Sequence, residues 1–373
     1  MRIAVRPGSR PKGLRKLATV VGLTASAALA SCGDSPASRS DDAAPAPAAQ
    51  AVNAGRAANS ITDVYERVSP AVVSINAARL GQRSAPIADY FVGRPQPGPP
   101  VLESMSSGSG FFISADGHVL TNNHVLGDAN QVTVVLVDGR ELPASIVGRD
   151  PDTDLAVLKV SGSGFPHVNF ASAANPKVGE AVIAIGNPFG LGTTATHGII
   201  SAYGRNIGSP YVDYVQLDAP INQGNSGGPT FNERGEVIGV NTAIFSPTGG
   251  SVGIGFAIPA STASSVATEL VKTGRIERGY IGASLIDLPR SPETGAQLAG
   301  AMVAGVVIGG PAHRGGLRPG DIITEVSGDK TENAADVIRK VVSSKPGDTL
   351  GFSVRRNNAD LPVSVRIDKR PTE

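Results

Sequence analysis

Gly-Asn-Ser-Gly-Gly-Pro at residues 224–229 is the stretch that decides the fold of this chain. It holds one serine, Ser226, between glycines, where main-chain N–H groups can point at an oxyanion that develops beside the serine. The apolar run 237–240 follows after a turn signal and is typical of a strand. The segment therefore predicts a nucleophilic serine on a tight turn that leads into a strand.

Two upstream motifs supply partners for this serine. Thr-Asn-Asn-His-Val at 121–125 follows an expected strand, and Asp152-Thr153-Asp154 precedes the apolar strand 155–158. Serine is a weak nucleophile at its own pKa, so it needs a base, and the base needs a carboxylate to fix its tautomer. We assign these roles to Ser226, His124 and Asp154. Asp150 and Asp152 are alternatives, but Asp154 directly precedes a buried strand, where a carboxylate needs a partner such as an imidazole N–H.

The order of the three residues separates two fold classes. The pattern G-x-S-x-G around Ser226 also occurs in α/β-hydrolases, but that fold places a helix after the serine and the histidine last. Here the only histidine downstream is His313, in a different module. The order His, Asp, Ser is that of the chymotrypsin-type barrels, so we expect a mostly β protein with a double β-barrel.

Composition agrees with this class and excludes others. The chain has 373 residues, enough for two or three domains, with Lys+Arg 33 against Asp+Glu 32 and 40% hydrophobic residues. Such a chain is not wholly disordered, and a net charge of +1 argues against nucleic acid as a partner. High contents of glycine (46) and proline (28) indicate many turns. There is one cysteine and no Cys/His cluster, so we expect no intramolecular disulfide, no metal and no cofactor.

Residues 1–31 are expected to be a signal peptide. Six Lys and Arg residues precede the apolar run 17–29, which is shorter than the roughly 20 residues that a spanning helix needs. Leu-Ala-Ser-Cys at 29–32 resembles the bacterial lipoprotein box, which predicts lipidation at Cys32, the mature N-terminus. Gly33 resembles the pattern that permits transfer to the outer membrane. The alternative is an ordinary signal peptide with an incidental cysteine.

The rest of the chain divides into a tether and two modules. Residues 32–60 are rich in Ala, Pro and Ser and are expected to form a flexible tether. A helix is expected over 61–68, a strand over 71–77 and an irregular loop over 79–106, and short strands follow from 108 to 259.

Two more helices are expected. The first follows Pro259, with Ser261 as its cap, with Val266, Leu270 and Val271 on one face, and with its end at Gly274. The second is Ala334–Ser343, in the module 280–370.

Five motifs of the chain, in this order, resemble the HtrA/Deg serine proteases. They are Gly-Ser-Gly-Phe at 108–111, the His124 and Asp154 motifs, residues 222–229, and Gly-Ile-Gly-Phe-Ala-Ile-Pro at 253–259. The resemblance implies a trypsin-like protease domain over 61–276, a homotrimer, and an ATP-independent endopeptidase that faces the periplasm and acts on unfolded envelope proteins. Residues 280–370 resemble one PDZ domain, which implies that Tyr280, Ile281 and Gly282 bind the C-termini of peptides.

The resemblance also predicts the residues around the nucleophile. The oxyanion hole is expected at the N–H groups of Gly224, Asn225 and Ser226. The position six residues before the nucleophile, the pocket base of a trypsin-like barrel, is Pro220 and not Asp, which excludes a preference for Lys or Arg. Ile221 and Ile254 are expected to line a small apolar S1 pocket, with Phe245 closing it.

Regulation by the PDZ domain is expected to pass through Arg205.

The chain departs from the family pattern at Leu217, Pro220 and Gln223, which flank the site. A second function class also fits: a non-proteolytic holdase or adaptor that uses the PDZ module to hold exposed C-termini.

Overall fold

The computed structural model describes residues 60–83, 98–172, 177–187, 192–222, 224–247, 249–289 and 298–371. All of them belong to one compact unit, Ala54–Glu373. The expected signal peptide and Cys32 lie outside the described residues.

The described chain begins with helix α1 (Ile61–Val68), at the predicted bounds. Ser60 caps it, because its hydroxyl accepts from the Asp63 N–H while the Asp63 carboxylate accepts from the Ser60 N–H. Val64 and Val68 are buried, so the helix packs by one face. The 3₁₀ turn η1 (Ser69–Ala71) then leads into the first strand.

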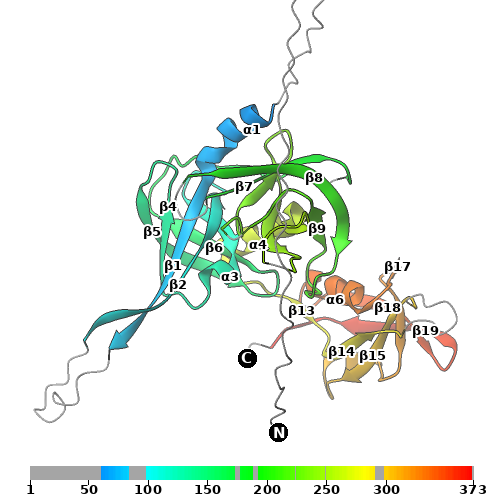
Figure 1. The fold of residues 1–373 in the computed structure, drawn as a ribbon. Coiled ribbons are helices and arrows are strands. Elements are labelled where there is room, and N and C mark those ends of the chain that lie inside the picture. Colours follow the sequence, from blue (N-terminus) through cyan, green and yellow to red (C-terminus); the bar gives the residue numbers. More distant parts are fainter. Residues whose placement is uncertain are drawn as a thin grey trace, which may run out of the picture. The chain divides into compact units, whose positions relative to one another are not determined.

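The first six strands close into a barrel in the order β1-β2-β3-β6-β5-β4 (Figure 1). They are β1 (Val72–Arg83), β2 (Gly98–Phe112), β3 (His118–Asn122), β4 (Gln131–Val135), β5 (Glu141–Asp150) and β6 (Leu155–Val160). A closed barrel leaves no unpaired strand edge.

The prediction of an irregular loop over 79–106 is wrong at both ends. Strand β1 continues to Arg83 and β2 already begins at Gly98, and the two pair beyond Ala78, where the pairing of β1 with β4 ends. The result is a two-stranded ribbon that continues past the barrel (Figure 1). Proline in a strand is tolerated at its first residues and at edges, which explains why the Pro-rich sequence misled.

The next six strands form a second closed barrel, in the order β10-β11-β12-β9-β8-β7. They are β7 (Ala181–Gly186), β8 (Thr194–Arg205), β9 (Tyr214–Leu217), β10 (Pro229–Phe231), β11 (Val237–Ile244) and β12 (Gly255–Pro259). The mostly β double barrel that the residue order predicted is thus the observed fold.

One apolar cluster joins the two barrels. It includes Phe111 and Leu155 of the first barrel and Ile185 and Phe231 of the second, all fully buried. Burial of apolar surface stabilises a contact by about 25 cal/mol per Å². This shared cluster therefore holds the two barrels against each other. His124 and Asp154 belong to the first barrel and Ser226 precedes β10 of the second, so this cluster sets the alignment of these three residues.

Helix α4 (Ala260–Thr273) follows the second barrel and contacts β5, β6 and β11. It ends at Gly274, whose φ of 75° is left-handed, as predicted. Two details differ from the prediction: Pro259 is the N-cap, so Ser261 lies inside the helix, and Val271 is 40% exposed, not on the buried face.

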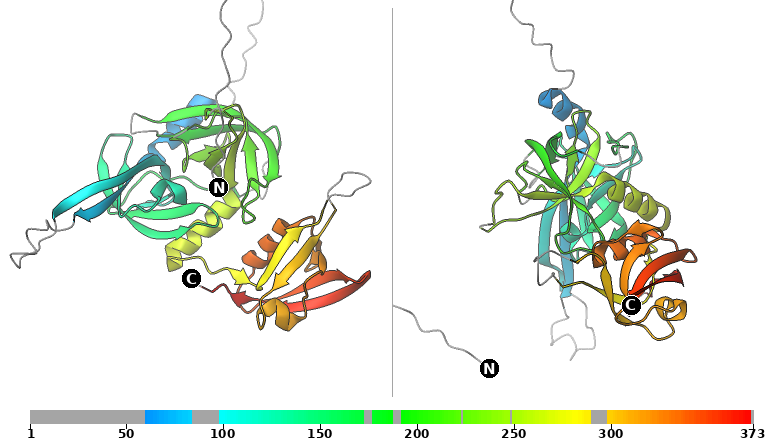
Figure 2. Two further views of the ribbon diagram at one scale, coloured as in Figure 1. Left: turned by 60° about the horizontal axis from the view of Figure 1, so that its bottom comes forward. Right: turned by 90° about the vertical axis from the view of Figure 1, so that its right-hand side faces the viewer.

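The C-terminal module is a sheet with two helices. Strands β14 (Ala283–Asp287), β15 (Ala301–Val306), β16 (Ile322–Val326), β18 (Thr349–Arg356) and β19 (Ala359–Arg366) form it in that order. Helix α6 (Ala334–Ser343), with the predicted bounds, contacts β14, β15 and β16 (Figure 2). The short elements are β13 (Gly279–Tyr280), α5 (Pro311–Gly315), β17 (Asp329–Lys330) and β20 (Asp368–Lys369).

Candidate active site

His124 lies on the short helix α3 (Asn123–Leu126), which begins where β3 ends. Its backbone N–H donates to Asp154 Oδ1 over 2.9 Å, and its Nδ1 lies 2.7 Å from Asp154 Oδ2. The imidazole is 49% exposed and the carboxylate 24%. The carboxylate therefore fixes the orientation of a ring that solvent and substrate can reach.

Asp154 stands in the turn between β5 and β6 with a left-handed backbone, φ 58°. Such a conformation is uncommon outside glycine, although Asp tolerates it better than most residues. The Asp154 carbonyl accepts from the Asn123 N–H and from the Asn122 side chain, which holds the turn against α3. Of the three candidate acids, Asp154 is the one that reaches His124.

Sequence analysis missed a fourth residue, Thr242 of β11. Its hydroxyl donates to Asp154 Oδ2 over 2.7 Å, so the carboxylate binds groups from both barrels. Burial raises the pKa of Tyr214, a hydrogen bond with Ser209 opposes the shift, and the nearby charge of Asp154 adds to it. Serine and threonine are common near the ends of strands, so the sequence around Thr242 did not indicate this contact.

Ser226 lies on the turn before β10 and is partly buried. Its Oγ lies 3.5 Å from the Thr242 carbonyl, and no hydrogen bond joins it to His124 within the described residues. Catalytic hydrogen bonds are often loose without substrate, and a rotation about χ1 is enough to move the hydroxyl.

The turn that carries Ser226 depends on glycine. Gly227 has a φ of 83°, and a Cβ there would lie 2.2 Å from the Ser109 carbonyl oxygen and 2.5 Å from Thr121 Oγ1. No other residue fits this position without moving backbone. The glycines around Ser226 thus allow the second barrel to approach the first closely.

The expected oxyanion hole is reduced from three donors to two. The Asn225 N–H donates to the Asn222 carbonyl, so it is not available. For the N–H groups of Gly224 and Ser226 there is no acceptor among the described residues. Two such donors on one turn can bind a developing oxyanion.

The two rival acids bind arginines instead of His124. Arg278 donates to both oxygens of Asp150, over 2.7 and 2.6 Å, in a pair that is almost fully buried. Arg370, near the end of the chain, donates to Asp152 over 2.8 Å. Both arginines belong to segments that follow the second barrel.

The residues expected in the S1 pocket differ in exposure. Ile221 is 1% exposed and belongs to the apolar cluster of the second barrel. Ile254 is partly buried, whereas Phe245 is 60% exposed. The N–H of Phe245 donates to the Ile254 carbonyl, so these two lie at the base of the loop between β11 and β12.

Arg205 is the last residue of β8. Its Nε donates to the Gln216 side chain over 3.1 Å. The contacts of the following loop with the C-terminal module come from residues that sequence analysis did not select. Asp213 pairs with Arg339 of α6 over 3.0 Å, and Tyr211 accepts from Arg370.

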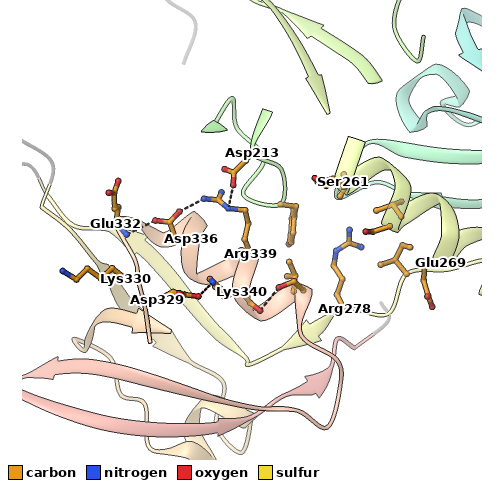
Figure 3. Close-up of a pocket in the computed structure, with 18 residues that line it drawn as sticks. Asp213, Ser261, Glu269, Arg278, Asp329, Lys330, Glu332, Asp336, Arg339 and Lys340 are labelled. Atoms are coloured by element: carbon orange, nitrogen blue, oxygen red, sulfur yellow. Dashed lines mark hydrogen bonds and ion pairs between the residues drawn. The ribbon is translucent and has the colours of Figure 1, made fainter. Parts of the chain in front are cut away.

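These contacts border a crevice of about 900 Å³. Figure 3 shows Arg339 on α6 between Asp213 and Asp336. Burial raises the pKa of Asp213, Arg339 opposes the shift, and Asp336 adds to it. The loop between β8 and β9 thus contacts α6 through charged groups.

Tyr280, Ile281 and Gly282 line a cavity of about 200 Å³ between β14 and α6. Strand β14 is an edge of its sheet, so an extended peptide can add beside it. Ile338 and Val341 of α6 supply apolar surface, and Tyr211 and Arg370 line the same cavity.

Two further findings concern the described residues alone. They contain no cluster of three or more His, Cys, Asp or Glu that could hold a metal ion. Nor does any helix among them have the length and apolarity needed to cross a membrane.

Comparisons with known families match both modules. Residues 108–240 match the trypsin-like peptidase domain, and residues 279–367 match the PDZ domain. A probable periplasmic serine endoprotease, DegP-like, of Brucella suis biovar 1 is 42% identical over 353 residues, which cover 83% of this chain and 69% of the relative. A protein of the same name from Hahella chejuensis is 40% identical and covers 84% and 70%.

Solved structures agree with these relatives. The HtrA-type protease AlgW with a decapeptide has a TM-score of 0.70 and 38% identity, over 84% of this chain and all of that chain. The serine endoprotease from Yersinia pestis has a TM-score of 0.63 and 35% identity, over 84% of this chain and 98% of that chain.

Proposed function

This chain belongs to the HtrA family of serine proteases, and from that premise we propose how its residues act and on what. Ser226 is the nucleophile, His124 the general base and then acid, and Asp154 the carboxylate that orients the imidazole. The observation that carries the proposal is the 2.7 Å contact between His124 Nδ1 and Asp154 Oδ2, which Thr242 links to Ser226 by contacting both Asp154 and Ser226. The domain boundaries that go with it are 61–276 for the protease and 280–370 for the PDZ domain.

In the proposed reaction Ser226 Oγ attacks the scissile carbonyl and gives its proton to His124 Nε2. Asp154 accepts a hydrogen bond from the Nδ1–H, remains ionised, and stabilises the imidazolium. The N–H groups of Gly224 and Ser226 bind the oxyanion. The proton then passes to the leaving amine, and water hydrolyses the acyl-enzyme by the same steps.

The test is Ser226→Ala, which should abolish cleavage of casein while the fold stays intact. Turnover near that of the unchanged protein would show that the nucleophile is misassigned. A fluorophosphonate should label the unchanged protein at Ser226. Absence of labelling after addition of a PDZ ligand would favour the holdase, the alternative that the relatives' names do not support.

We propose cleavage after small aliphatic residues such as Val, Ala or Ile. Pro220 stands where a trypsin-like pocket has its acid, and Ile221, Ile254 and Phe245 offer only apolar surface. Ile221 is almost fully buried and supports the pocket from behind, whereas the partly buried Ile254 and the exposed Phe245 are the side chains proposed to contact the P1 residue. Profiling of cleavage sites is the test, and a majority of basic or large aromatic P1 residues would exclude this specificity.

We propose that C-terminal peptides bound at Tyr280, Ile281 and Gly282 stimulate proteolysis. Since Tyr211 lines the same cavity, a bound peptide contacts the loop between β8 and β9 directly. Arg205, at the base of that loop, is the residue proposed to pass the signal on. Arg205→Ala should reduce stimulation without abolishing peptide binding, and equal stimulation at saturating peptide would show that Arg205 carries no signal.

We place the protein in the periplasm, as the names of its relatives state for them, with unfolded proteins as its substrates. A lipid anchor at Cys32, the outer membrane and a homotrimer complete the proposal. Mass spectrometry of the mature N-terminus tests the anchor, and an unacylated start would exclude it. Sedimentation of the detergent-solubilised protein tests the trimer.

A further inference from the structure

The hydroxyl of Ser109 is fully buried beneath the turn that carries Ser226. Ser109 belongs to β2 of the first barrel and is 0% exposed. Its Oγ donates to the Gly224 carbonyl over 2.5 Å and accepts from the Asn187 N–H over 2.8 Å. Both partners belong to the second barrel, so one side chain of the first barrel holds two segments of the other.

The main chain of Ser109 adds a contact at the other end of the same turn. Its N–H donates to the Ser226 carbonyl over 2.8 Å. The Ser109 carbonyl in turn accepts from Thr121 Oγ1 over 2.7 Å. Ser109 therefore holds the segment from Gly224 to Ser226 at both ends and is itself held in place.

The contact to Gly224 matters because a glycine rotates freely about both of its backbone bonds. Gly224 has a φ of 101°, and its N–H is one of the two donors left for the oxyanion. A hydrogen bond on its carbonyl fixes the rotation on one side of the residue. Without that bond the peptide plane between Gly224 and Asn225 also turns about ψ of Gly224. The residue as a whole is then held less firmly, and so is the direction of its N–H, which lies on the preceding peptide plane.

We propose that Ser109 is a positioning residue for the oxyanion hole, acting through Gly224 and not through the substrate. This inference rests on the proposed function of Ser226. Loss of a whole oxyanion donor costs about 10²- to 10³-fold in kcat. A donor that is misdirected but present costs less, so we expect a fall of about 10- to 100-fold in kcat for Ser109→Ala, with KM almost unchanged.

Ser74 provides a matched control. It pairs with Ser109 in the register of β1 and β2, is also 0% exposed, and its hydroxyl has no hydrogen-bond partner within the described residues. Ser74→Ala therefore removes the same atom from the neighbouring position without freeing a partner. Its kcat should stay within about twofold of the unchanged protein.

The experiment measures hydrolysis of a peptide with an aliphatic P1 residue, per site that a fluorophosphonate labels to completion. Counting labelled sites removes the effect of unfolded protein, so a merely less stable Ser109→Ala keeps the unchanged kcat. A peptide aldehyde, whose adduct carries an oxyanion, should bind Ser109→Ala about 10- to 100-fold more weakly. Ser109→Cys keeps a weak hydrogen-bond donor, so its kcat and aldehyde affinity should lie between those of the unchanged protein and of Ser109→Ala. This variant replaces Ser109→Ala in the experiment if Ser109→Ala does not fold.

The outcomes separate this inference from the function that it rests on. If the unchanged protein hydrolyses the peptide but kcat per labelled site is equal in Ser109→Ala, Ser109 is only structural and the inference is wrong. Equal losses in Ser109→Ala and Ser74→Ala, or an unchanged aldehyde affinity, overturn it as well. If the unchanged protein neither cleaves nor labels, it is the proposed function that fails.

Discussion

Arg278→Gln is predicted to destabilise the protease barrels strongly, although Arg278 lies outside them. Arg278 stands in the segment between α4 and β13, and its guanidinium is 9% exposed. It donates to both oxygens of Asp150, which is 2% exposed, and lies 5.5 Å over the ring of Tyr211. The substitution leaves the Asp150 carboxylate buried with a single remaining donor, the Thr153 hydroxyl.

The size of the effect follows from these contacts. Two hydrogen bonds to a charged group are lost, each worth about 1.5–3 kcal/mol. Measured losses for one partner of a buried ion pair are about 3–5 kcal/mol, in the same range. Asp150→Asn in the same chain removes the uncompensated charge, so the double variant should recover more than half of the loss.

Urea unfolding followed by far-UV circular dichroism measures the free energy of unfolding. Arg355→Gln is the control, because Arg355 and Asp360 form an exposed pair, 51% and 68%, and such pairs contribute less than about 1 kcal/mol. A loss below about 1 kcal/mol for Arg278→Gln, or no recovery in the double variant, would refute the reasoning.

Three further predictions concern the site, the groove and the pH response. Thr242→Val removes a hydrogen bond to the Asp154 carboxylate, so kcat/KM for a peptide should fall about 10- to 100-fold, and a fall under threefold contradicts this role. Ile338→Asp puts a charge into the groove beside β14, so fluorescence anisotropy should show at least tenfold weaker binding of an apolar C-terminal peptide, with unchanged labelling of Ser226 in its absence. Burial of Asp321 raises the pKa of that carboxyl, but the hydrogen bonds from Arg356 and from the Arg318 N–H, with the charges of both arginines, together lower it more, so its folded pKa lies below the usual 3.8. Its stabilising contribution is therefore present above about pH 4 and lost as the pH falls through the folded pKa, and the urea midpoint of Asp321→Asn should lack this dependence.

The strands could be predicted from the sequence, and the three residues proposed for catalysis could be selected from it, because their signals are local. Apolar runs between turn residues gave both barrels, and the order of His124, Asp154 and Ser226 along the chain separated the barrel from the α/β-hydrolase fold. The partners of the rival acids could not be predicted in this way. Asp150 and Arg278 are 128 residues apart, and Asp152 and Arg370 are 218 apart. No periodicity encodes such a pair.

The remaining errors have physical reasons of the same kind. Ser261 is a good N-cap residue, but Pro259 precedes it and helix α4 starts one residue after the proline, without a side-chain cap. The Asn225 N–H was counted as an oxyanion donor because sequence does not reveal which N–H groups a tight turn uses internally. The role of Thr242 depends on the approach of two barrels, which only the packed structure determines.

The distribution of strand edges has a consequence for solubility. Unfolded chains, the substrates proposed above, add readily to any free strand edge and can carry a protein into aggregates. Within the two closed barrels each strand is paired on both sides, so free edges lie outside them, among others on the ribbon of β1 and β2 beyond Ala78. In the C-terminal sheet the outer strand β19 contains Pro362, which has no N–H to donate, and two charged residues, Asp360 and Arg366. The edge of β14 lies beside the peptide cavity, so a client strand that adds there enters a binding site and does not start an aggregate.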